Sequence, residues 1–149
     1  MEDRSEALAI ARIGASATVG ALVLQFILGM YTNLYVAFSP VQSLGSGGMT
    51  GGGMMGAMSQ AMSGSTVLML HMMLGWLLLI LASLALIGAV IARRPRATLF
   101  ATLGMGAIAV AGYGGLRFLV TGQDGYSFVM AVGFIAAVGS YFGEAVALR

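Results

Sequence analysis

The stretch "LHMMLGWLLLILASLALIGAVI", Leu70 to Ile91, decides the fold class of this chain. It contains no charged residue, and apolar side chains fill nearly every position. A helix of about 20 apolar residues is long enough to cross the ~30 Å hydrocarbon layer of a membrane. We therefore predict a transmembrane helix here, with its ends at about residues 66 and 92.

Three further apolar stretches have this length, at about residues 13–38, 97–120 and 126–148. The composition agrees, since only 8% of the residues are charged, whereas soluble domains carry about 25%. Backbone groups in lipid must be paired within the protein, and none of these stretches alternates in polarity as barrel strands do. The sequence therefore predicts an all-α, polytopic membrane protein, with one four-helix transmembrane domain over residues 1–149.

The arginines predict the orientation of this domain. Six of them flank the predicted spans: Arg4, Arg12, Arg93, Arg94, Arg96 and Arg149. With four spans all six fall on one side, and that side is expected to be cytoplasmic. We expect both termini inside, a multi-pass protein of the cell inner (plasma) membrane, and an outward Gly/Met-rich loop at residues 39–65.

The residues before the first span, "EDRSEALAIAR", are expected to begin a short helix capped by Ser5. This helix either lies on the inner membrane surface or continues the first span. The first apolar stretch is longer than the ~7–15 residues of a secretion-signal core, so we interpret it as a retained span.

Small residues predict how the helices associate. Gly104, Ala107, Ala111 and Gly115 recur at helical spacing in the third span, and Gly139 with Gly143 forms a GxxxG pair in the fourth. Such positions let helix backbones approach closely in lipid. They indicate packing inside the bundle, or a docking face for another membrane protein.

Polar residues inside a span are costly, so they are candidates for function. Asn33, His71, Tyr113 and Arg117 are predicted at similar depth near the outer side, where they could form a pocket for a quinone headgroup, a haem propionate or a lipid phosphate. In the alternative interpretation, Arg117 reaches the membrane boundary and pairs with Asp124.

Two other polar residues have structural explanations. Gln25, at the centre of the first span, is expected to make an interhelical hydrogen bond. Glu144, near the inner end of the fourth span, is expected to reach the lipid headgroups or to form an ion pair with Arg94.

The only histidine, His71, is a candidate ligand of b-type haem, because histidine and methionine form an accepted axial pair. Met130 and Met30 lie near enough in predicted depth to supply the second ligand. Four-helix bundles build cofactor sites between facing helices. The sequence therefore keeps open a haem- or quinone-binding electron-transfer protein.

Copper is the other cofactor that the methionine-rich region could bind. The candidate ligands are Met54, Met55, Met58, Met62 and His71. Thioether sulfur is a soft ligand that suits Cu(I). Against this, methionine is also a flexible hydrophobic residue that fills irregular contact surfaces, and the loop carries no charge.

The order "LVLQFILGMYTNLYV" followed by "LHMMLGWLLLILA" resembles small uncharacterised four-helix membrane proteins of bacteria and archaea. In those proteins "LH-x-x-LG" lies in the second span, and an "NG-x-x-FL"-like motif ends the third. Here the second motif is only partly kept, as "GGLRFL" at residues 114–119. Through "LQFILG" and His71 the chain is more distantly similar to one half of haem A synthase and to cytochrome b561-type bundles. Those families use more histidines than this chain has.

Most enzyme classes lack their residue sets here. The chain has no cysteine, no HExxH motif and no Ser–His–acid set, and its glycine-rich loop lacks the lysine of a P-loop. We therefore expect no catalytic residues, and no basic aromatic stripe indicates nucleic acid. The expected function is a non-catalytic accessory or structural subunit of a larger membrane complex, with a respiratory or redox complex as one candidate. Its expected partners are membrane lipid and other membrane-protein subunits or further copies of itself.

Overall fold

The computed structural model describes residues 2–35 and 65–149. Within these ranges the protein consists of four helices: α1 (Glu2–Tyr35), α3 (Thr66–Ile91), α4 (Pro95–Thr121) and α5 (Asp124–Ala147). All four are long and apolar enough to cross a membrane. The prediction of an all-α chain with four candidate membrane spans is confirmed.

The ends of α3, α4 and α5 differ by at most two residues from the predicted ends. Helix α1 differs more, because it begins at Glu2 as one continuous helix of 34 residues. Ser5 therefore lies inside α1 and does not cap it. The segment from Glu2 to Arg12 contains no glycine or proline and three alanines, so its composition favours continuing the helix.

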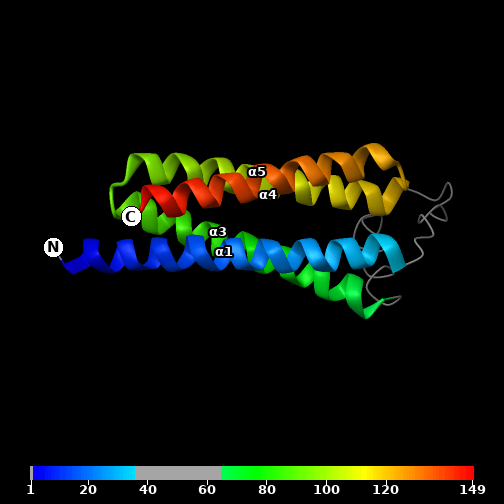
Figure 1. Ribbon diagram of the computed structural model, residues 1–149, viewed down its shortest axis with the longest axis horizontal. Coiled ribbons are helices and arrows are strands. Elements are labelled where there is room, and N and C mark those ends of the chain that lie inside the picture. The colour runs from blue at the N-terminus through cyan, green and yellow to red at the C-terminus, as the bar shows by residue number, and fades with distance from the viewer. Residues whose placement is uncertain (1, 36–64) are drawn as a thin grey trace, which may run out of the picture.

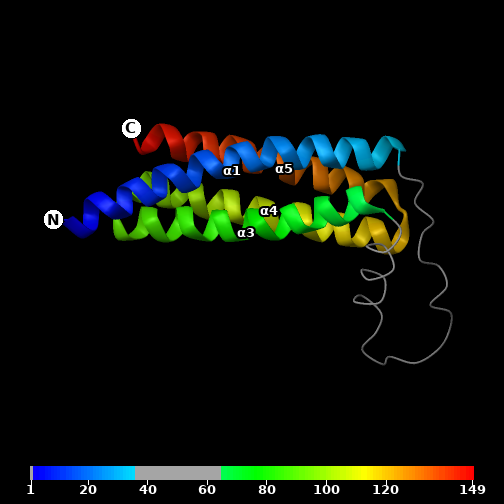
Figure 2. The ribbon, with the colours of Figure 1, turned by 90° about the horizontal axis from the view of Figure 1, so that it is seen from below.

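The helices run alternately up and down, and helices that follow one another in the sequence lie side by side (Figure 1). Helices α1 and α3 form one closely packed pair and α4 and α5 another; smaller contacts of α3 with α4 and of α1 with α5 join the pairs into a bundle. Both termini and the α3–α4 turn lie at one end in both views (Figures 1 and 2). We name it the arginine end, because Arg12, Arg93, Arg94, Arg96 and Arg149 lie there; the opposite end is the loop end.

The core consists of two clusters made mainly of small residues. Cluster 1 contains Leu22, Leu78, Ala82, Ala85, Ala107, Ile108, Ala137 and Tyr141. Cluster 2, nearer the arginine end, contains Ala11, Ala15, Ala89, Ala97 and Leu148. Because alanine side chains are short, the helix backbones can approach one another closely around both clusters.

Glycines mark the closest approaches of α1 to α3. A Cβ atom added at Gly88 would lie 2.8 Å from the backbone nitrogen of Ala11. One added at Gly14 would lie 3.1 Å from the Cα atom of Ala85. The two contacts place a glycine of each helix against an alanine of the other.

Helices α4 and α5 meet in the same way along most of their length. A Cβ at Gly133 would lie 2.8 Å from the nitrogen of Ala111, and one at Gly114 would lie 2.9 Å from the nitrogen of Met130. Gly104 accommodates the ring of Tyr141. The predicted small-residue face is thus present, but Gly114 rather than the predicted Gly115 makes the backbone contact.

Gly139 has no neighbouring atom within 4 Å of its added Cβ, so the predicted Gly139–Gly143 pair does not act as one unit within the bundle. Gly143 alone packs on the ring of Phe100.

Local chemistry explains the helix ends. The side chain of Ser65 accepts a hydrogen bond from the Leu68 nitrogen and caps α3. Pro95 begins α4, where its missing N–H would have no helical partner. Gly122 ends α4 at φ 66°, a left-handed conformation that glycine adopts without steric cost.

Large apolar side chains are exposed on all four helices, among them Ile13, Ile80, Leu99 and Phe128. A soluble monomer rarely exposes such continuous apolar surface. This exterior is typical of helices that face lipid.

Candidate functional site

His71 lies in the contact between α1 and α3. Its Nε2 atom is 3.3 Å from the side-chain nitrogen of Gln25, within hydrogen-bond distance. The imidazole ring also packs against Gly29, where an added Cβ would lie 3.1 Å from the ring carbon Cε1. The predicted interhelical hydrogen bond of Gln25 is therefore present, and its partner is His71.

The structure does not bring His71 together with the methionines considered as second haem ligands. Met130 belongs to α5, which lies across the bundle from α3, and its sulfur packs near Gly115 of α4. Met30 follows Gly29 on α1, but its side chain is 43% exposed. A porphyrin ring between α1 and α3 would have to displace the contact of Gly29 with His71. The contacts of His71 that the structure shows are with Gln25 and Gly29, and haem ligation by His71 stays a prediction.

The predicted outer polar pocket is also not assembled by these helices. Asn33 on α1 is exposed, and Tyr113 on α4 is 57% exposed. Arg117 instead interacts with α5: its Nη2 donates a hydrogen bond of 3.2 Å to the hydroxyl of Tyr126, and its guanidinium lies 5.2 Å from the centre of that ring. Tyr126, rather than the expected Asp124, is thus the partner of Arg117.

The methionines proposed as copper ligands, Met54, Met55, Met58 and Met62, lie in residues 36–64, outside the described part of the chain. In the described ranges, no group of three or more His, Asp or Glu side chains could hold a metal ion.

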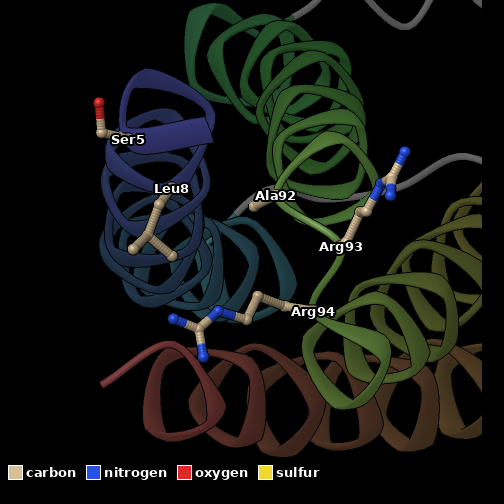
Figure 3. Close-up of a pocket in the computed structure, with 5 residues that line it drawn as sticks. All are labelled: Ser5, Leu8, Ala92, Arg93 and Arg94. Carbon is tan, nitrogen blue, oxygen red and sulfur yellow. The ribbon is translucent and has the colours of Figure 1, made fainter. Parts of the chain in front are cut away.

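A pocket of about 420 Å³ lies at the arginine end, between the start of α1 and the α3–α4 turn. Ser5, Leu8, Ala92, Arg93 and Arg94 line it. The side chain of Arg94 extends toward α1 near Leu8, whereas Arg93 turns to the other side (Figure 3). An apolar wall beside a guanidinium is chemistry that suits an anionic lipid headgroup.

Glu144 differs most from expectation. We predicted that Glu144 reaches the lipid headgroups or pairs with Arg94, but its side chain is fully buried, and neither carboxylate oxygen has a hydrogen-bond partner among the described residues. Tyr141, one turn earlier on α5, is also fully buried, and its hydroxyl lacks a partner in the same part of the structure.

The spacing of Ala137, Tyr141, Glu144 and Leu148 is the sequence signal that could have identified this face. Steps of four, three and four residues keep all four on one side of a helix.

No protein-family model, curated protein or solved structure matches this chain.

Proposed function

We propose that this chain is a non-catalytic subunit of a larger membrane complex, with four spans in the cell inner membrane and both termini in the cytoplasm. The observation that carries the proposal is a set of small residues on the outside of the α4–α5 pair that packing within the bundle does not use. The clustered arginines at one end of the bundle support the orientation, because cytoplasmic loops are enriched in Lys and Arg.

The bundle uses some of its glycines and leaves others open. Gly104, Gly114 and Gly133 each contact the neighbouring helix, whereas Gly106 on α4 and Gly139 on α5 have no atom within 4 Å of an added Cβ. Glycine inside a helix lowers helix propensity by about 1 kcal/mol relative to alanine. In lipid, a glycine on a helix surface lets a second helix approach closely.

Two glycines of α4, Gly106 and Gly112, have no atom within 4 Å of an added Cβ, and Gly106 belongs to a longer exposed stripe. Thr102, Gly106, Ala109 and Tyr113 follow one another at steps of four, three and four residues, and all four are exposed. They therefore share one face of α4. We name this the docking stripe.

Gly106 and Gly139 lie at the same depth of the bundle. Gly104 packs on Tyr141, and α4 and α5 are antiparallel (Figure 1). Gly106, two residues after Gly104, therefore lies level with Gly139, two residues before Tyr141. The open positions of the two helices thus occur in one layer, where a membrane-spanning helix of a partner subunit could lie close to the α4–α5 pair.

The arrangement of His71 supports a structural role over electron transfer. Its ring is engaged by Gln25 and Gly29 on the neighbouring helix, as expected of a hydrogen-bonded residue that joins two spans.

Site-directed photo-crosslinking in the native membrane tests the proposal. A benzophenone amino acid replaces Tyr113 of the docking stripe, and the matched control replaces Tyr31 on α1, which is 49% exposed. We expect an adduct with a different membrane protein from position 113, absent from position 31 and lost when Gly106→Leu is added.

An adduct of two copies of this chain would make it a homo-oligomer and overturn the assignment of a partner subunit. Equal adducts from both tyrosine positions would show that the docking stripe is not selective, and would contradict the proposal.

A further inference from the structure

The arginine-end half of α5 turns a continuous face into the bundle. Ala137, Tyr141 and Glu144 are 0% exposed, and Leu148, directly after the helix, is 1% exposed. Tyr141 belongs to cluster 1 and Leu148 to cluster 2. Glu144 lies between them in sequence, so its carboxyl group is held at the junction of two apolar clusters.

Helix α1 places a second polar group at this junction. Thr18 is 0% exposed and lies between Ala15 of cluster 2 and Leu22 of cluster 1. Its hydroxyl donates a hydrogen bond of 2.8 Å to the Gly14 carbonyl, which leaves the oxygen lone pairs as acceptors.

The register of α1 and α5 brings the two polar positions to similar depth. The side chain of Arg12 contacts the carbonyl of Leu148, and the helices are antiparallel. Counting toward the loop end from this contact, Thr18 is six residues from Arg12, while Glu144 and Tyr141 are four and seven residues from Leu148. By this count Thr18 lies in the same part of the bundle as Glu144 and Tyr141.

Among the side chains that the structure describes, no opposite charge is paired with Glu144. On α1, Arg12 donates to the carbonyls of Leu148 and Arg149, and Glu6 is exposed. On α4, Arg94 and Arg96 are exposed near its start. Helix α3 carries no charged residue, and its one titratable side chain, His71, lies near the loop end. On α5 the neighbouring titratable group is Tyr141.

A carboxyl group enclosed in this way requires a counter-charge, a hydrogen-bond donor or its own proton. The described residues supply neither a counter-charge nor a hydrogen-bond donor. Both carboxyl oxygens are buried, so the smallest ligand, a proton, is the one that the site admits without rearrangement.

The site is closed on the side of the arginine end. Leu148 lies one turn beyond Glu144, and its carbonyl accepts a hydrogen bond of 2.8 Å from Nε of Arg12. A second bond of 3.4 Å joins Nη2 of Arg12 to the Arg149 carbonyl. Arg12 thus holds Leu148 and Arg149, the residues that follow Glu144 toward the arginine end.

We propose that Glu144 is an internal proton-binding site of the bundle, with Tyr141 and Thr18 as its polar neighbours and with Leu148, held by Arg12, closing it from the solution at the arginine end. Binding adds one proton to a carboxylate oxygen and release removes it, so that no electron transfer or further reactant is involved.

Infrared spectroscopy of the purified full chain in lipid tests the proposal directly, because the chain has only five carboxyl side chains. We expect one C=O stretching band of a protonated carboxyl group at neutral pH. This band should be absent in Glu144→Gln and should weaken as the pH rises. Tyr141→Phe, which keeps the ring, should shift its frequency without removing it.

A spectrum without this band, or a band that remains in Glu144→Gln, would overturn the proposal. A band that does not respond to pH would show a permanently protonated structural group, and one that disappears on adding Na⁺ at constant pH would show a metal-cation site; either result contradicts a proton site.

A pH jump tests the closure. Arg12→Ala should speed the response of the band several-fold over wild type, whereas Arg96→Ala, a matched loss of an exposed arginine at the same end, should not. Equal responses of the two variants would overturn the role of Arg12.

Discussion

Arg12 of α1 donates a hydrogen bond of 2.8 Å from Nε to the carbonyl of Leu148, 136 positions further along the chain. This bond joins the first and last helices, whose contact is the smallest of the four helix pairs that build the bundle. It also gives a donor to the Leu148 carbonyl, which lies after the end of α5 and therefore receives no hydrogen bond from a following turn of helix. One side chain thus joins α1 to the residues that follow α5.

Replacing Arg12 with alanine should lower the free energy of unfolding by about 1 kcal/mol, because hydrogen bonds from charged donors are among the stronger ones in proteins. The measurement is circular dichroism of the helices as SDS is added to mild-detergent micelles. Arg96→Ala is the control, since it removes the same charge from an exposed position. Equal loss in both variants would mean that charge, and not the bond to Leu148, stabilises this end.

Gly88 and Gly20 should respond in opposite directions to substitution by alanine. A Cβ at Gly88 would lie 2.8 Å from the backbone of Ala11, whereas Gly20 has open space around it. Gly88→Ala should therefore destabilise the fold by about 1–3 kcal/mol through overpacking, while Gly20→Ala should gain up to ~1 kcal/mol of helix propensity. The same SDS titration measures both, and a neutral Gly88→Ala would show that α1 and α3 do not approach as closely as described.

The hydrogen bond between Gln25 and His71 should appear as a coupling energy. A double-mutant cycle with Gln25→Leu and His71→Leu should give about 0.6 kcal/mol of favourable coupling, the average for such bonds in membrane bundles. If the two substitutions changed the free energy of unfolding additively, the hydrogen bond would not stabilise the bundle, and the structural role of His71 would be contradicted. A Soret band in the wild-type protein that is lost in His71→Leu would show haem ligation instead.

Gly122 should be hard to replace. Its φ of 66° is disfavoured for residues with a Cβ, so Gly122→Ala should cost roughly 1–2 kcal/mol. Gly125, two residues into α5 at a position with open space, is the matched control and should tolerate alanine. If both variants unfold at the same SDS fraction, the left-handed turn is not what ends α4.

The fold was largely predictable, for a simple reason. Each helix contains a mainly apolar stretch of about the length required by a bilayer, so its position can be predicted from the local sequence. Helix α1 runs without a break from Glu2, which confirms the alternative that the first residues continue the first span; hydropathy could not choose between the alternatives, because it marks where an apolar stretch begins and not where a helix does. The residues before Ile13 are polar enough to lie outside lipid, yet they favour helix as strongly as those inside.

The contacts were less predictable, because they depend on how each helix is rotated and on its register with its neighbours. Sequence spacing placed Gly104 and Ala107 on one face, but only the register of α4 against α5 selects Gly114 over Gly115. The same limit applies to Glu144. Its distance from the end of α5 predicted a boundary ion pair, whereas rotation of the helix turns its side chain into the core.

Native mass spectrometry of the chain, released from its own membranes in a mild detergent, tests the central claim most directly. The proposed subunit role predicts a mass that contains at least one different membrane protein, and loss of that mass in Gly106→Leu while the four helices stay folded. A mass made up only of copies of this chain would contradict the subunit role.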